Sequence, residues 1–165
     1  MKSNKGFTLI ELLAVIVILA IIALIATPII LDVIDTARKG AKESSALGYV
    51  DAVEKQVMLA QVDTSATKIP AGTYKVSDLS QKLGVEIKGE GPKGYLSTDS
   101  EDGVVKIATN GSVEKAWLIF DSYYVTYTGN NGKAVASNDA FTDEPTSGFC
   151  NVTGTTVNCG TGSGI

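Results

Sequence analysis

Two cysteines near the C-terminus are the residues of this sequence whose type and spacing most directly suggest covalent chemistry. Cys150 and Cys159 are separated by eight residues, whereas the cysteines of redox-active pairs are typically separated by two. Two thiols are also too few for a structural zinc site, which takes four ligands. We therefore predict one disulfide bond, and with it an oxidising compartment outside the cytoplasm.

The composition gives little support to catalysis or metal binding. The chain has no histidine, which excludes Ser–His and Cys–His catalysis and every metal site that needs an imidazole. Asp99, Glu101 and Asp102 could bind Ca²⁺, but the spacing of a known calcium loop is absent, and a solvated turn is the favoured interpretation. The formal charge of −4 shows no basic excess for a nucleic-acid partner. We expect no enzyme activity, metal, cofactor or small-molecule substrate.

One uncharged apolar run dominates the first part of the chain. Residues 12–31 read LLAVIVILAIIALIATPIIL, and twenty helical residues span roughly 30 Å, the thickness of a bilayer core. Lys2 and Lys5 precede the run, as in a secretory signal. The run is longer than a usual signal core and no small-residue cleavage site follows it cleanly, so we expect the helix to be retained as a single membrane span.

The residues K-G-F-T-L-I-E, at 5–11, resemble the class III leader of type IV pilins and pseudopilins. The resemblance implies that a prepilin peptidase cuts between Gly6 and Phe7 and that the new N-terminal Phe7 is N-methylated. It also implies that Glu11 and Thr8 take part in assembly. The expected partners are the membrane, the peptidase, the pilus assembly machinery and other pilin subunits, with which the chain forms a homopolymer.

Glu11 is an ionisable group in apolar surroundings, where insertion of an acid costs about 2.5–3.5 kcal/mol at the bilayer centre. Phe7 and Glu11 are four residues apart and share a helical face. Cleavage after Gly6 would create an amine at Phe7 that could pair with Glu11 of the same chain or of a neighbour, and the resemblance implies the neighbour. The alternative is that Glu11 simply reaches the lipid headgroups.

Pro28 matches a proline that is common in the helices of that family. Proline removes one backbone hydrogen bond and clashes with the carbonyl of the residue four before it, here Leu24. We expect a kink or a local opening of the helix near Pro28. Two interpretations stay open: a harmless kink in the membrane, or a segment that unwinds when subunits pack.

An amphipathic pattern follows the apolar run. Apolar residues recur at three- and four-residue steps, which predicts one helix from about Phe7 to Gln61 with a stripe that needs a domain to lie against. The stripe comprises Val33, Ile34, Ala37, Ala41, Ala46, Val50, Val53 and Val57. The predicted organisation is a leader at 1–6, a membrane or filament-core helix at 7–31, its amphipathic half at 32–61 and a β-rich head at 62–165.

The head shows strand and turn signals. Residues 63–72 read as a linker, and 77–83 as a short helical turn that Ser77 caps and Gly84 ends. Strands are predicted at 104–109 and 112–120 around a two-residue Asn110-Gly111 turn, and at 123–128 and 133–136 around 129–132. These indicate a four-stranded antiparallel meander on the helix stripe, an α+β fold, and the resemblance implies that this fold is of the type IV pilin kind. Trp117, Ile119, Tyr124 and Val125 are expected in its core.

The C-terminal sequence C-N-V-T-G-T-T-V-N-C predicts a hairpin with Gly154 and Thr155 in a type II′ turn. The predicted pairs are Thr153–Thr156, Val152–Val157, Asn151–Asn158 and Cys150–Cys159. The cysteines then occupy a non-hydrogen-bonded site with Cα atoms about 4.5 Å apart, close enough for a disulfide. Closing ten residues stabilises by about 2.7 kcal/mol on the chain-entropy estimate.

Three functions remain open at this stage. The first is a structural type IV pilin that is inserted in the membrane as a prepilin and then polymerised at the cell surface for adhesion or motility. The second is a pseudopilin of a type II secretion or DNA-uptake system, which shares the same N-terminus; the disulfide hairpin and the head of about a hundred residues favour the pilin. The third is a membrane-tethered extracellular enzyme or binding domain that uses the helix only as an anchor.

Overall fold

The computed structural model describes residues 6–95, 102–145, 147–153 and 156–159. The chain divides into an N-terminal unit that ends at Arg38 and a head that begins at Lys39. One helix, α1 (Leu9–Val62), crosses this division, and its 54 residues correspond to a length of roughly 80 Å. The predicted helix is confirmed, with both ends within two residues of their predicted positions.

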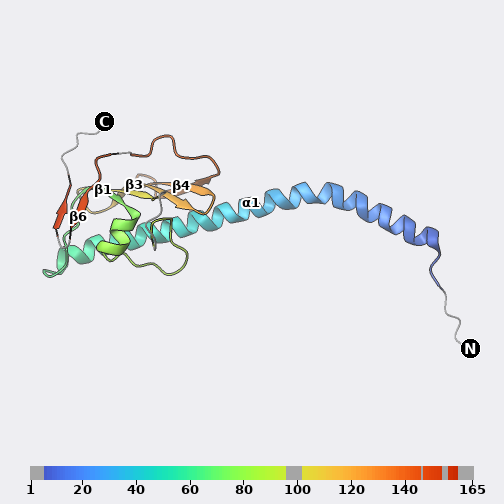
Figure 1. Cartoon of the computed structure of the whole chain (residues 1–165), viewed down its shortest axis with the longest axis horizontal. Coiled ribbons are helices and arrows are strands. Elements are labelled where there is room, and N and C mark those ends of the chain that lie inside the picture. The colour runs from blue at the N-terminus through green and yellow to red at the C-terminus, as the bar shows by residue number, and fades with distance from the viewer. Residues whose placement is uncertain (1–5, 96–101, 146, 154–155, 160–165) are drawn as a thin grey trace, which may run out of the picture. The chain divides into compact units, whose positions relative to one another are not determined.

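The head is built on the second half of α1 (Figure 1). The predicted stripe residues Ala46, Val50, Val53 and Val57 are buried, and Tyr49, which the stripe did not include, is buried with them. Further toward the N-terminus Val33 is 63% exposed and Ile34 42% exposed. The packed part of the stripe is therefore shorter than predicted and begins at Ala46.

Five strands form one antiparallel sheet in sequential order, β1 (Gly72–Lys75), β2 (Val104–Ile107), β3 (Val113–Phe120), β4 (Tyr123–Thr128) and β5 (Lys133–Ser137). The four predicted strands are present. The prediction of four strands was wrong because β1, whose first residue was assigned to the linker, adds a fifth. β1 pairs with β2 across a long intervening segment, so no local turn signal marks it.

The β2–β3 connection is one residue longer than the predicted two-residue turn. Ala108 and Ser112 pair through the Ala108 N–H and Ser112 O (2.9 Å), and Gly111 N–H donates to Ala108 O (3.0 Å). Gly111 has a φ of +85°, which glycine adopts without steric cost. This is a three-residue loop whose left-handed last residue is typical of such hairpins.

The sheet has two covered faces. Leu118, Phe120 and Val125 belong to the core cluster that includes the α1 stripe. Trp117 and Ile119 are also buried, but they alternate with Leu118 and Phe120 and so lie on the opposite face.

Trp117 and Ile119 are buried, as predicted for the core, but they and Tyr124 lie on the face of the sheet opposite to the helix-facing core cluster. Residues that follow β5 contact two of them: Trp117 Nε1 donates to Asp143 Oδ1 at 2.9 Å, and half-buried Tyr124 meets Phe141 edge-to-face at 5.2 Å between ring centroids. Of the four predicted core residues, Val125 packs with the helix.

Carboxylates of α1 bind backbone donors of the sheet. Glu54 Oε1 accepts the Val113 N–H at 2.9 Å, and Glu43 Oε1 accepts the Ala136 N–H at 2.9 Å. Ala136 lies on the edge strand β5, where an outward N–H has no strand partner within its sheet. Two charged side chains of α1 that are not part of the predicted apolar stripe therefore fasten the sheet to the helix.

A short π-type helical turn, η1 (Asp78–Lys82), follows β1. The predicted turn is confirmed, and Gly84, with a φ of +72°, follows it. The predicted cap is wrong, because Ser77 makes no side-chain capping bond. Its hydroxyl instead donates to Asp102 Oδ2 and its N–H to Asp102 Oδ1.

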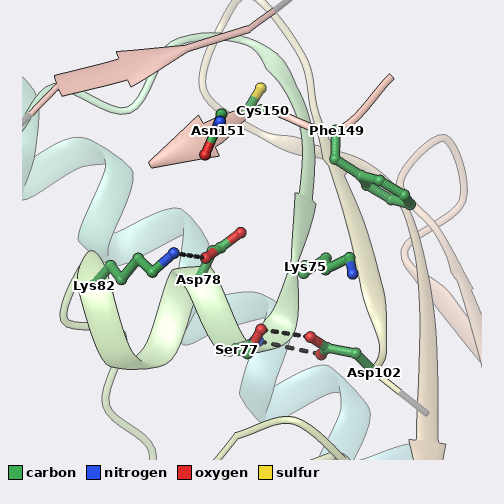
Figure 2. Close-up of a pocket in the computed structure, with 8 residues that line it drawn as sticks. All are labelled: Lys75, Ser77, Asp78, Lys82, Asp102, Phe149, Cys150 and Asn151. Carbon is green, nitrogen blue, oxygen red and sulfur yellow. Dashed lines mark hydrogen bonds and ion pairs between the residues drawn. The ribbon is translucent and has the colours of Figure 1, made fainter. Parts of the chain in front are cut away.

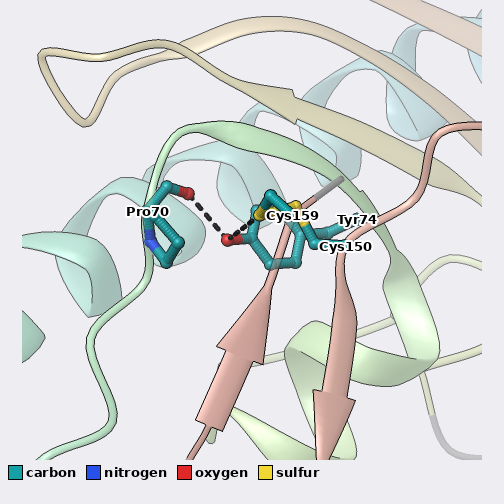
Figure 3. The surroundings of a disulfide bond; sticks show 4 residues. All are labelled: Pro70, Tyr74, Cys150 and Cys159. Atoms are coloured by element: carbon teal, nitrogen blue, oxygen red, sulfur yellow. Dashed lines mark hydrogen bonds between the residues drawn. A yellow bond between two sulfur atoms is a disulfide. The ribbon is translucent and has the colours of Figure 1, made fainter. Parts of the chain in front are cut away.

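The C-terminal hairpin consists of β6 (Asn151–Thr153) and β7 (Thr156–Asn158). The three predicted strand pairs and the disulfide are confirmed, and the Cα atoms of Cys150 and Cys159 are 4.0 Å apart. The predicted turn at Gly154 and Thr155 lies outside the described residues. Tyr74 Oη donates to Pro70 O at 2.7 Å and lies 3.5 Å from Cys159 Sγ (Figure 3).

The disulfide lies directly on the backbone of Gly72, where an added Cβ would overlap both sulfur atoms. We expect Gly72→Ala to destabilise the head by roughly 1–3 kcal/mol, the usual cost of overfilling a packed site. Urea unfolding of the full chain in detergent measures the change. Gly48→Ala is the matched control, because nothing lies within 4 Å of a Cβ there and alanine favours a helix by about 0.5–1 kcal/mol over glycine. Equal stability of Gly72→Ala and the parent chain would contradict the close contact.

Candidate processing and assembly site

Thr8 and Glu11 form a closed hydrogen-bonded pair at the start of α1. Glu11 Oε2 accepts both the Thr8 N–H and the Thr8 Oγ1 hydroxyl at 2.8 Å, and the Glu11 N–H approaches Thr8 Oγ1 at 3.3 Å. This is a capping box, in which a threonine at the N-cap and a glutamate three residues later satisfy each other's backbone donors. Both residues were predicted to act in assembly, but the capping box was not predicted, although the letters T-L-I-E carry its T-x-x-E signal.

The capping box also fixes where the Glu11 carboxylate lies. The side chain folds back toward the N-terminus of its own chain, and Thr8 contacts one of its two oxygens, Oε2. A negative charge in the first turn is favourable beside the unpaired N–H groups and the positive end of the helix dipole. The pair therefore stabilises the helix start and holds the acid close to Phe7.

Gly6 and Phe7 lie outside the helix, and both are exposed; Phe7 is 90% exposed. Nothing lies within 4 Å of the position that a Gly6 Cβ would take. The fold of the chain therefore has no steric need for glycine here. The Gly6–Phe7 bond stands in an accessible segment immediately before the N-cap, where a protease could bind an extended backbone.

The apolar part of α1 presents its large side chains to the outside on all sides in the single chain. From Leu9 to Leu31 its leucines, isoleucines and valines are about half exposed or more. By length and composition α1 is able to cross a membrane. Such a surface needs either lipid or other apolar helices around it.

Pro28 lies inside this apolar part, and α1 continues through it. Pro28 has no N–H for the carbonyl of Leu24. One residue earlier, the Thr27 hydroxyl donates to Ala23 O at 2.7 Å, a back-bond that often bends helices. The backbone around Pro28 thus has one bond fewer than the helix on either side.

A pocket on the head is lined by several charged side chains (Figure 2). Burial raises the pKa of the Asp102 carboxyl, while its two hydrogen bonds from Ser77 act in the opposite direction. Asp102 is thus a half-buried structural acceptor rather than part of a solvated turn; Asp99 and Glu101 lie outside the described residues. Lys82 pairs with Asp78 at 2.7 Å. The pocket is lined by Lys75, Ser77, Asp78, Lys82, Asp102, Phe149, Cys150 and Asn151.

Most charged side chains of this pocket are bound to neighbouring residues of the same chain, so we interpret the pocket as a structural feature of the head. Within the described ranges, no three His, Cys, Asp or Glu side chains are grouped so that they could hold a metal ion. The N-terminal segment is consequently the stronger candidate for a functional site.

Comparison with known proteins points to the same segment. Residues 1–27 match the family model described as the prokaryotic N-terminal methylation motif. Searches of curated proteins and of solved structures found no match. The matched stretch contains Gly6, Phe7, Thr8 and Glu11, and the apolar helix together with this leader motif fits a membrane-anchored prepilin. The chain thus carries the N-terminal signature of the type IV pilin-like prepilins, on a long helix packed against an antiparallel sheet.

Proposed function

We propose that this chain is a structural subunit of a type IV pilus. It enters the membrane as a prepilin, is cleaved after Gly6 and N-methylated at Phe7, and polymerises through its N-terminal helix into an extracellular filament. The observation that carries the proposal is the combination of the methylation motif with an apolar helix that is exposed on every side. The role is structural and needs no catalytic site, cofactor or small-molecule substrate.

The apolar helix has to be buried, either in the membrane or in a filament. Complete burial of one leucine, isoleucine or valine side chain is worth about 1.5–3 kcal/mol relative to water. Lipid satisfies this demand in the membrane, and other copies of the helix satisfy it in a filament. Because lipid tails are as apolar as leucine, the preference of the helix for the filament over the membrane must come from packing and polar contacts.

Glu11 supplies such a polar contact. Cleavage after Gly6 converts the Phe7 amide nitrogen into a positively charged amine, and the Thr8 hydrogen bonds hold Glu11 within the first helical turn beyond it. In the proposed filament this carboxylate pairs with the Phe7 amine of a neighbouring subunit. Charge pairs that lack water are far stronger than exposed ones, so the contact favours a defined register between subunits.

Pro28 gives the helix a place to change when subunits pack. The missing hydrogen bond at Leu24 O lowers the cost of local unwinding relative to the neighbouring turns. In the proposed filament this segment opens and allows extension. The heads then form the coat. Removal of Lys2 and Lys5 with the leader makes the mature subunit more acidic, and an acidic filament surface keeps filaments apart in solution.

Gly6→Leu is expected to block processing, so that the full-length precursor accumulates in the membrane. The physical reason is steric exclusion from the peptidase, because the chain itself has open space at Gly6. An immunoblot of membrane fractions distinguishes the precursor from the product by size. Gly40→Leu, at a glycine within α1 that also has open space around it, is the control and should be processed normally. Normal cleavage of Gly6→Leu would refute the proposed cleavage site.

Glu11→Ala is expected to insert in the membrane but to reduce filament yield by at least about tenfold, because one lost charge pair of about 1.4 kcal/mol already shifts an equilibrium tenfold. The yield of sheared filaments measures this. Glu11→Gln is the decisive companion, because glutamine also completes a capping box but carries no charge. If Glu11→Gln assembles normally, Glu11 acts as a helix cap and the charge-pair proposal is wrong.

The intact mass of protein sheared from the cell surface tests the function as a whole. The expected mass is that of Phe7–Ile165 plus one methyl group and less two hydrogens for the disulfide. Abundance in the sheared fraction supports a pilus subunit, whereas the same mass confined to membranes supports a pseudopilin. Unprocessed protein in the membrane would overturn both and leave a tethered binding domain.

A further inference from the structure

We propose that Asn131, in the turn between β4 and β5, is a site of spontaneous deamidation, and that the fold protects Asn110, which is also followed by glycine. The chain thus offers two copies of the same reactive dipeptide, Asn110-Gly111 and Asn131-Gly132, each in a hairpin turn. The inference does not depend on the proposed function. It concerns a chemical modification of the head.

The reaction needs only the chain and water. The backbone nitrogen of the glycine loses its proton and attacks the Cγ of the preceding asparagine, forming an N–Cγ bond. The Cγ–Nδ2 bond breaks and the side-chain amide leaves as ammonia, which closes a five-membered succinimide ring. Water then opens the ring at either carbonyl and gives aspartate or isoaspartate. Glycine favours the attack because it has no Cβ to obstruct the ring and can adopt the backbone angles required.

At Asn131 the electrophile and the nucleophile are both available. Asn131 Oδ1 accepts the Lys133 N–H at 3.2 Å, which polarises the side-chain carbonyl and folds it over the following backbone. Within the turn, the Asn131 N–H donates to Thr128 O, and the Gly129 N–H donates to Glu114 O of the neighbouring strand β3. Among the described contacts, none engages the Gly132 N–H.

The surroundings of Gly132 also leave room for the ring to form. Asn131 and Gly132 are both exposed. Nothing lies within 4 Å of the position of a Gly132 Cβ. The backbone at this point can therefore rotate toward the succinimide geometry without displacing another part of the head.

At Asn110 the electrophile is at least as well prepared, but the nucleophile is held. Asn110 Oδ1 accepts the Ser112 N–H at 3.1 Å and the Ser112 hydroxyl at 2.7 Å. The Gly111 N–H, however, donates to Ala108 O at 3.0 Å. The protection of Asn110 therefore comes from the hydrogen bond of the Gly111 N–H and not from the contacts of the asparagine side chain.

Packing against α1 adds to this protection. Gly111 is buried, and the position of its Cβ would lie 3.1 Å from Val57 Cγ1 and 3.2 Å from Gln61 Nε2. Rotation of the Gly111 backbone must therefore disturb the contact between this hairpin and the helix. The backbone of the Asn-Gly dipeptide is thus held in place at Gly111 and has room to rotate at Gly132.

The product changes the head at a defined place. Each conversion at Asn131 adds one negative charge beside Lys133, in a chain that is already acidic. Isoaspartate also adds one methylene to the main chain, next to the Thr128–Lys133 pair that closes the β4–β5 hairpin. Aspartate and isoaspartate at this position therefore accumulate slowly as the protein ages.

The test incubates the full chain in detergent at mildly alkaline pH and follows both dipeptides by peptide mapping. Deamidation raises the peptide mass by one unit, and isoaspartate is separated from aspartate by chromatography. We expect Asn131 to react at least about tenfold faster than Asn110. At Asn110, the hydrogen bond of the Gly111 N–H and the packing of Gly111 against α1 must be broken first. The rate at Asn131 should rise with pH, since the attacking nitrogen must lose a proton.

The control is the same chain in guanidinium chloride with the disulfide reduced, where both dipeptides should react at similar rates. The variant Asn131→Gln should remove the fast mass gain from the folded chain. Equal rates at the two sites in the folded chain would overturn the proposal, as would an unreactive Asn131 there. A tenfold difference that persists in the denaturant would also overturn it, because sequence rather than fold would then set the rate.

Discussion

The absence of any polar face on the first half of α1 is the constraint on which the rest of this protein depends. A helix that is apolar all round has no stable arrangement in water by itself. It must be surrounded by lipid or by other helices, and the side chains from Leu9 to Leu31 are largely exposed in the single chain. A subunit that keeps such a helix therefore needs a membrane or other subunits around it. The leader motif, the capped start and the proline all belong to this segment.

The second half of the same helix has the opposite relation to its surroundings. From Ala46 onward one stripe of α1 is inside the head, and its carboxylates Glu43 and Glu54 accept backbone N–H groups from the sheet. Lys42 extends this with ion pairs to Glu90 at 2.5 Å and Asp121 at 3.1 Å. The helix is thus part of the core and of the polar frame of the head. Substitutions in the second half of α1 would alter the fold of the head. Substitutions in the first half would alter the contacts of the helix with lipid or with other helices.

The sequence was a good guide wherever a structural element is marked locally. The helix, the β4–β5 hairpin and the register of Cys150 with Cys159 follow from periodicity, turn residues and alternation. It was a poor guide to long-range choices. Strand β1 pairs with β2 across nearly thirty residues. Alternation along β3 could not tell which face the helix covers, so the expected core residues included side chains from both faces of the sheet. At the candidate site, the T-x-x-E signal for the Thr8–Glu11 pair was present and was overlooked.

That overlooked pair bears on how one helix start could serve a precursor and a filament. The bonded atoms belong to Thr8 and Glu11, and both residues follow the Gly6–Phe7 bond. Cleavage there would remove none of them, so the geometry of the helix start would survive processing. What would change is charge, since a positive amine would appear one residue before the N-cap. With Oε2 bound to Thr8, a carboxylate keeps further lone-pair sites for such an amine. Processing would then create the partner of a carboxylate already in position, without any refolding of the helix.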